Sequence, residues 1–404
     1  MEPARTRRSP WSGRGLPRDV RALAATSFLQ DVASEMVYPL LPAFLLRLGG
    51  GAAALGAMEA AAEGVLALVK GWAGRESDRR GRRKGLVLAG YGLSAATRPL
   101  LALAASALHV VLLRVADRTG KGLRTAPRDA LIADATAPEQ RTFAFSYHRG
   151  LDHLGAAVGP LLAAGVLALA PGNVRLVFAL ATVPAVLGVL NVALRVRERR
   201  AGEAPQLAAP PAAGAPARPR GAVPRALRLP LLAFFLFSLG NASDAFLLLR
   251  AAALGVSPIG LTLLWSAFHV AKWVFSAPAG RLADRLGPGR VLLAGWGLYA
   301  AVYLGFALAT DLRALAALLL LYALHYGLTE GAERALVVSL GGDAGTGTVL
   351  GAFHLATGLG LFLASLVFAA MWELVAPAAA FALGAVLALL AATALAAVLR
   401  TSRA

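Results

Sequence analysis

Long apolar runs constrain this chain more than any other feature of its sequence. A helix crosses the hydrocarbon core of a bilayer, about 30 Å thick, with roughly 20 apolar residues. Twelve such runs follow one another along the 404 residues, at approximately 22–46, 52–72, 85–104, 108–127, 142–168, 174–194, 229–250, 256–277, 291–309, 313–333, 347–370 and 376–399. Only 15% of the residues are charged, which is too few to cover a water-soluble protein of this length. We therefore predict an all-α polytopic membrane protein with twelve transmembrane helices.

The positions of lysine and arginine predict the topology, because membrane proteins keep most basic residues on the cytoplasmic side. If the N-terminus is inside, the cytoplasmic segments hold 28 of the 40 basic residues, the external loops hold four and the spans hold eight. We expect a multi-pass protein of the plasma membrane with both termini in the cytoplasm. Its net charge of +18 then faces lipid headgroups rather than nucleic acid.

One long segment, residues 196–228, interrupts the apolar pattern and is rich in Ala, Pro and Arg. Such a composition cannot bury enough apolar surface to fold alone. The predicted organisation is a basic N-terminus (1–21), a six-helix bundle (22–195), a disordered cytoplasmic linker (196–228), a second six-helix bundle (229–399) and a short cytoplasmic tail (400–404).

Several function classes lose support because their sequence signatures are missing. The chain has no cysteine, which excludes disulfides and thiol chemistry. Its six histidines show no metal-binding spacing, and no phosphate-binding GxxxxGK[ST] motif occurs. We predict that the protein is not an enzyme, holds no cofactor or metal and is a monomer. A membrane-embedded enzyme or sensor is the less favoured alternative.

An internal repeat links the two halves of the chain. The pattern G-x-x-x-D-R-x-G occurs at residues 74–81 and again at residues 280–287, an offset of 206. The same offset relates His148 to His354 and Arg128 to Arg334. A parallel duplication of a six-helix unit is typical of transporters whose halves surround a central axis.

The first copy resembles the signature loop of the major facilitator superfamily, G-x-x-x-D-R-x-G-R-[KR]-[KR], at every fixed position of residues 74–84. The resemblance implies that fold, alternating-access transport and a loop that latches the two halves together. The latch would use one set of residues in each copy: Gly74, Asp78, Arg79, Gly81 and Arg82, and Gly280, Asp284, Arg285 and Gly287. The amino-acid sequences of residues 31–42 and 118–129 are similar to those of a prokaryotic branch of the superfamily.

The fifth span contains Gly155, Gly159 and Pro160, which resemble the G-x-x-x-G-P-x-x-G-G motif of drug–proton antiporters. The last two glycines of that motif are Ala163 and Ala164 in this chain. The resemblance implies efflux in exchange for protons. The alternative is ordinary close packing of helices through small residues.

Charged residues inside the spans predict the transport site, because a charge at mid-membrane costs at least about 2.5 kcal/mol and has to face a cavity or a partner. Helical spacing places several of them on shared faces. The candidates for a substrate and proton cavity are Asp31, Glu35, Glu59, Glu63, Arg114, Arg118, Lys121, Arg149, Asp152 and Asp244. By the resemblance, the first, fourth, seventh and tenth spans line that cavity.

Other polar residues in the spans have interpretations that the sequence leaves open. Glu330, Glu333 and Arg334 form either a structural ion pair or a gate near the cytoplasmic end. Lys272 either faces the cavity or extends to the inner interface, and Arg124 and Arg128 are expected to anchor the inner end of the fourth span.

The functional prediction is secondary active transport of a small organic solute by proton-coupled efflux. A carboxylic acid buried in a cavity takes up a proton more readily than one in water, so protonation changes the cavity charge and couples proton flow to solute movement. The alternative is a proton-coupled or uniport importer of an organic anion, favoured by the basic residues of the fourth span.

Overall fold

The computed structural model describes residues 13–49, 52–198, 223–241, 244, 247, 258–342 and 344–401. These residues contain helices and turns and no strand. The N-terminal half comprises η1 (Gly13–Gly15), α1 (Arg18–Val37), η2 (Tyr38–Leu40), α2 (Leu41–Arg47), α3 (Ala52–Arg80), α4 (Lys84–Ala102), α5 (Ala107–Ala135), η3 (Pro138–Gln140), α6 (Arg141–Leu169) and α7 (Val174–Arg195). The C-terminal half comprises α8 (Arg225–Gly240), α10 (Pro258–Leu286), α11 (Pro288–Leu308), α12 (Leu312–Leu340), α13 (Thr346–Leu374) and α14 (Pro377–Thr401).

The predicted fold class is confirmed, because ten of the twelve apolar runs coincide with a helix of at least 19 residues in the part of the chain that the structure describes. The run 22–46 is divided among α1, η2 and α2, and the run 229–250 begins in α8. Six helical segments are long and apolar enough by themselves to cross a membrane: 138–169, 174–195, 288–308, 312–340, 346–372 and 377–400. The predicted N-terminus, linker and tail fall largely on residues 1–12, 199–222 and 402–404, which lie outside the described residues.

Several helices extend well past the predicted spans. α3 and α10 have 29 residues each, which at 1.5 Å per residue exceeds a bilayer core of about 30 Å by two turns or more. Gly74 and Asp78, predicted in a loop, therefore lie in the last turns of α3. The helices end only where a glycine adopts a positive φ, 61° at Gly81 and 91° at Gly287, because that conformation interrupts a right-handed helix. α8 ends at Gly240, and the rest of its predicted span falls largely outside the described residues.

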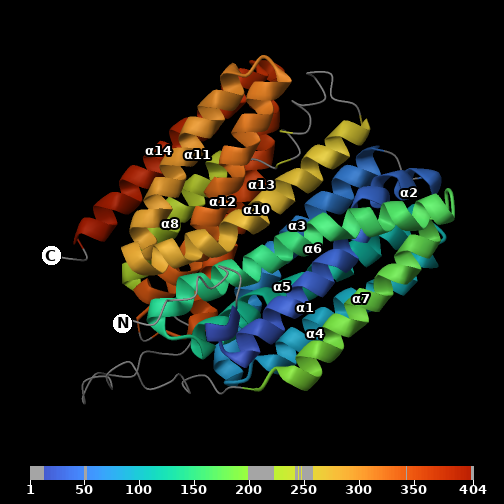
Figure 1. Cartoon of the computed structure of the whole chain (residues 1–404), viewed down its shortest axis with the longest axis horizontal. Coiled ribbons are helices and arrows are strands. Elements are labelled where there is room, and N and C mark those ends of the chain that lie inside the picture. The colour runs from blue at the N-terminus through green and yellow to red at the C-terminus, as the bar shows by residue number, and fades with distance from the viewer. Residues whose placement is uncertain are drawn as a thin grey trace, which may run out of the picture.

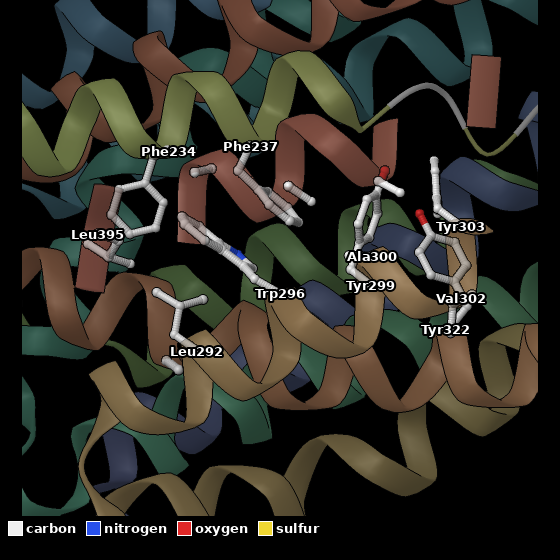
Figure 2. Close-up of a cluster of buried hydrophobic side chains, with 14 of the residues drawn as sticks. Phe234, Phe237, Leu292, Trp296, Tyr299, Ala300, Val302, Tyr303, Tyr322 and Leu395 are labelled. Atoms are coloured by element: carbon white, nitrogen blue, oxygen red, sulfur yellow. The ribbon is translucent and has the colours of Figure 1, made fainter. Parts of the chain in front are cut away.

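The two halves lie side by side, with α6 against α10 and α3 against α13 at their boundary (Figure 1). We call the end of the bundle that contains both G-x-x-x-D-R-x-G motifs the motif end. The core of the C-terminal half is aromatic: the Phe237 and Trp296 rings stack with centroids 4.5 Å apart, and Tyr299 stacks on Tyr303 at 4.0 Å (Figure 2). This packing joins α8 to α11 within the C-terminal half.

Candidate transport site and gate

At the motif end, Asp78 of α3 caps the first turn of α13 in the other half. Its carboxylate accepts hydrogen bonds from the backbone N–H groups of Gly347 (3.2 Å) and Thr348 (2.6 Å). These donors have no partner within their own helix, and a negative charge is favourable at a helix N-terminus. The side chain is 3% exposed. Gly74 makes this approach possible, since a Cβ atom there would overlap the backbone of Gly347.

The second copy repeats the arrangement with the halves exchanged. Asp284 of α10 accepts hydrogen bonds from the backbone N–H groups of Thr142 (3.0 Å) and Phe143 (3.1 Å), in the first turn of α6. A Cβ atom on Gly280 would lie 2.5 Å from the Cβ atom of Ser146. The capped threonines, Thr142 and Thr348, again differ by 206 positions. Each half therefore caps a helix of the other.

The two caps differ in their electrostatics. Arg83 binds Asp78 at 3.0 Å and Asp134 at 3.1 Å, and Thr346 donates a hydrogen bond to Asp134 at 3.1 Å. In the part of the chain that the structure describes, Asp284 makes no ion pair. Asp284 lies beyond the predicted span 256–277, and burial raises its pKa to about 6 although its hydrogen-bond donors lower it.

The basic residues of the motif are divided between the interior and the surface. Arg83 is 1% exposed, whereas Arg79, Arg82 and Arg285 are exposed. The resemblance implied a latch role for Arg79 and Arg82 and did not include Arg83. Nothing in a run of three consecutive basic residues shows which side chain turns inward, so the importance of Arg83 is visible only in the structure.

A second layer of ion pairs joins the halves one to two turns deeper. Glu330 of α12 binds Arg149 and His153 of α6, each at 2.7 Å. Asp129 of α5 binds Arg334 at 3.3 Å and His354 at 2.9 Å. These are contacts between the halves, so Glu330 and Arg334 stand where a gate between them would be. Asp129 had been assigned no role from the sequence.

On the side of this layer that faces away from the motif end, a cavity of about 270 Å³ lies between the halves. Its lining comprises Ser27, Asp31, Lys70, Lys121, Arg124, Thr125, Arg128, Arg149, Asp152, Phe237, Ser238, Asn241, Glu333, Arg334, Phe353, His354, Thr357 and Leu361. Four predicted cavity residues are among them: Asp31, Lys121, Arg149 and Asp152. Arg124 and Arg128, expected to anchor the end of a helix, line the cavity instead.

The other predicted cavity residues lie around it. Arg118 contacts Glu63 at 3.7 Å and Arg114 contacts Asp117 at 3.8 Å. Glu35 lies one turn beyond Asp31 on α1, and the side chain of Glu59 is outside the described residues. These positions are near the site but do not line the cavity as described.

The glycines of the fifth-span motif set the distance between α6 and α1. A Cβ atom at Gly155 would lie 2.5 Å from the carbonyl oxygen of Phe28, and one at Gly159 would lie 2.8 Å from the Cβ atom of Glu35. The motif therefore packs directly against the helix that carries Asp31 and Glu35. Close packing through small residues is thus observed, at the position where it fixes the two carboxylates.

The C-terminal half contains a separate polar cluster at the end of α8. Lys272 is 3% exposed, and its ammonium group lies 3.4 Å from Asp244 and 3.5 Å from the centre of the Tyr326 ring. Asp244 also accepts hydrogen bonds from the hydroxyl groups of Tyr322 and Tyr326, at 3.0 and 3.1 Å. Lys272 is therefore buried between α10 and α12, and the alternative of a lysine extended to the membrane interface is wrong.

Comparisons with known proteins agree with this architecture. The sequence model of the Major Facilitator Superfamily matches residues 23–250. An uncharacterized MFS-type transporter of Methanocaldococcus jannaschii is 31% identical over 389 residues, which cover 93% of this chain and 94% of that protein. An uncharacterized protein of Mycobacterium tuberculosis is 31% identical over 152 residues, 38% of this chain and 37% of that protein.

Two solved structures share the fold. The human organic anion transporter MFSD10 superposes with a TM-score of 0.80 at 19% identity, covering 94% of this chain and 99% of that one. The E. coli fucose:proton symporter FucP superposes with a TM-score of 0.75 at 15% identity, covering 94% and 98%. With a family match over more than half of the sequence and a relative aligned over nine tenths of it, the chain belongs to the Major Facilitator Superfamily of secondary solute transporters.

Proposed function

We propose that the protein is a proton-coupled transporter in the plasma membrane that moves a small organic anion through the cavity between its halves. The charge of the cavity carries this proposal. Six cationic side chains and three carboxylates line it, and the two carboxylates behind it, Asp129 and Glu330, bind three of the cations. Six positive and five negative charges leave an excess of one positive charge, which favours an anionic solute.

Two carboxylates of the lining are candidates for the coupled proton. Asp31 and Glu333 make no ion pair within the described residues, and a buried carboxylate without a counter-ion is the kind that takes up a proton. Protonation of both would raise the excess from one positive charge to three. A proton and an anion therefore strengthen each other's binding, and such mutual reinforcement favours movement of both in the same direction.

The direction of opening follows from the predicted topology. If the motif end is cytoplasmic, as the basic residues predict, the two caps and the deeper ion pairs close the cytoplasmic side. The cavity would then receive solute and protons from outside. To release them inside, both caps and the pairs of Glu330 and Asp129 would have to separate. This supports import of an anion together with protons down the proton gradient.

Efflux by antiport is the second candidate, because Gly155, Gly159 and Pro160 resemble an antiporter motif, and the two glycines pack against the helix of Asp31. The two candidates predict opposite linkage. In antiport the proton and the solute compete, so acid would weaken solute binding. In symport acid would strengthen it.

Reconstitution into proteoliposomes tests the proposal. A panel of small organic anions, neutral solutes and amines is offered outside, with the lumen at pH 7.5 and the outside at pH 6. We expect accumulation of one class of anion, driven by the proton gradient and abolished by a protonophore. Accumulation of amines or neutral solutes alone would refute the anion assignment, and anion uptake that is slowed by outside acid would favour antiport.

A further inference from the structure

The interface between α3 and α5 carries charges at two levels, and the levels differ. At the first level Glu63 of α3 faces Arg118 of α5, at 3.7 Å. Seven residues further on α3 is Lys70, and three residues further on α5 is Lys121. Both lysines line the cavity. The first level is an ion pair of opposite charge, whereas the second brings two like charges to the same wall.

A close helix contact fixes the two lysines at one depth. Gly122 of α5 lies against Val69 of α3, since a Cβ atom on Gly122 would be 2.8 Å from the Cβ atom of Val69. Lys121 and Lys70 are the immediate neighbours of these two contact residues. The glycine thus lets the two backbones approach where the two ammonium groups reach the cavity.

Neither lysine forms a direct ion pair in the described part of the chain, although the negative charge of Glu63 acts on both and that of Asp31 also acts on Lys121. The other cations of the lining are engaged: Arg149 binds Asp152 and Glu330, while Arg124 donates a hydrogen bond to Ser94 and lies over the Tyr91 ring. For Lys70 and Lys121 no carboxylate of the described residues lies within ion-pair distance. Two like charges inside a membrane protein are unfavourable unless an anion neutralises them.

We propose that Lys70 and Lys121 together bind a doubly charged head group of the solute, a compact dianion such as a dicarboxylate or a phosphate monoester. This rests on the proposed function and names the solute class. Two ammonium groups on adjacent helices provide six N–H donors, and charge-assisted hydrogen bonds to carboxylate or phosphate oxygens are the strong ones. Arg124, one turn along α5 from Lys121, extends the same positive face.

The opposite wall limits the rest of the solute. The C-terminal half contributes three apolar side chains to the lining, Phe237, Phe353 and Leu361, and six polar ones, Ser238, Asn241, Glu333, Arg334, His354 and Thr357. This mixed wall suits a short body that carries polar substituents as well as carbon. A cavity of about 270 Å³ is at the small end for ligand sites, which excludes a large second substituent.

Binding to the purified full-length protein tests the pair directly. The probes are succinate and glycerol phosphate as dianions and butyrate as a monoanion of similar size, measured by calorimetry at pH 7. We expect at least one dianion to bind, and butyrate to bind at least tenfold more weakly. Lys70→Gln and Lys121→Gln should each raise Kd for the dianion at least tenfold, equivalent to about 1.4 kcal/mol. Lys84→Gln, the same substitution at a half-buried position outside the cavity whose ammonium donates a hydrogen bond to the Ala193 carbonyl oxygen, should leave Kd unchanged.

A charge-reversal variant separates the pair from the transport function. Lys121→Glu places a carboxylate beside Lys70, so the protein should lose dianion binding more completely than Lys121→Gln does. Dianion binding that the two Gln variants or Lys121→Glu leave intact overturns the assignment even if anions are transported. If no anion of any kind binds the wild type or enters proteoliposomes, the proposed function itself fails. Binding of butyrate and the dianions with equal affinity would leave an anion transporter and overturn the dianion class.

Discussion

Asp78→Asn isolates the charge of one cap while preserving its shape. The amide oxygen can still accept one of the two N–H groups of α13, but the negative charge is gone. A carboxylate at a partly buried helix N-terminus contributes up to about 2 kcal/mol. The contact between Asp78 and Arg83 joins two residues of the N-terminal half and persists when the halves separate, so it does not enter the difference. The closed motif end should therefore lose up to about 2 kcal/mol, roughly thirtyfold in its equilibrium with the open form.

The absence of cysteine from the sequence makes this shift measurable with two introduced spin labels. Glu139→Cys and Ser339→Cys place labels on exposed positions at the motif end, one in each half. Pulsed electron–electron double resonance should give a single short distance between the labels in the labelled parent protein. After Asp78→Asn, a substantial population should show a longer distance. Asp284→Asn should not lengthen the distance, because burial in the closed cap raises the pKa of this carboxyl to about 6 and so already disfavours its charge. An unchanged distance distribution in Asp78→Asn, or a larger effect of Asp284→Asn, would refute the reasoning.

Three further predictions concern the same interface. The pKa of Asp284 is about 6 when the cap is closed and returns toward its ordinary 3.8 when water reaches it, so the closed form binds the proton more tightly. Lowering the pH on the motif side from 7 to 5 should therefore favour closure, and Asp284→Asn should remove this pH dependence of the label distance. Glu330→Gln leaves Arg149 and His153 without their shared carboxylate across the interface, and should reduce the transport rate at least tenfold while the protein still inserts; a normal rate would exclude a gating role. Gly74→Val should shift the labels to the longer distance as strongly as Asp78→Asn, since its side chain overlaps Gly347; Gly92→Val, at a glycine with open space around it, is the control.

The sequence predicts most of the fold, because bilayer thickness and hydrogen-bond satisfaction leave few alternatives to a helix of about twenty apolar residues. The repeat at an offset of 206 also leads directly to the two caps, since both copies place an aspartate at the same point of equivalent helices. The helix ends are less predictable. Polar residues such as Arg75 and Glu76 look like a loop in a hydropathy pattern, yet they continue α3 outside the apolar run until Gly81 ends it.

The candidate site is only partly predictable, for a physical reason. Helical spacing shows that Asp31 and Glu35 share a face, but pairing between halves depends on contacts more than a hundred residues apart in the chain. Arg128 and Asp129 are adjacent in sequence, and only the structure shows that Asp129 also meets Arg334 and His354 from the other half. Lys70 is one of the eight basic residues that the sequence places in the spans, and only the neighbouring helices show that it lines the cavity.

The two caps also turn four backbone amides into intrinsic reporters of gating. The amides of Thr142, Phe143, Gly347 and Thr348 have acceptors only while the opposite half is in place, because the first N–H groups of a helix have no acceptor within it. Separation of the halves exposes all four to solvent hydrogen exchange without unfolding α6 or α13. The exchange rates of the first pair then measure the opening of one cap and those of the second pair the other, so an unlabelled protein would show whether its two caps release together or in sequence.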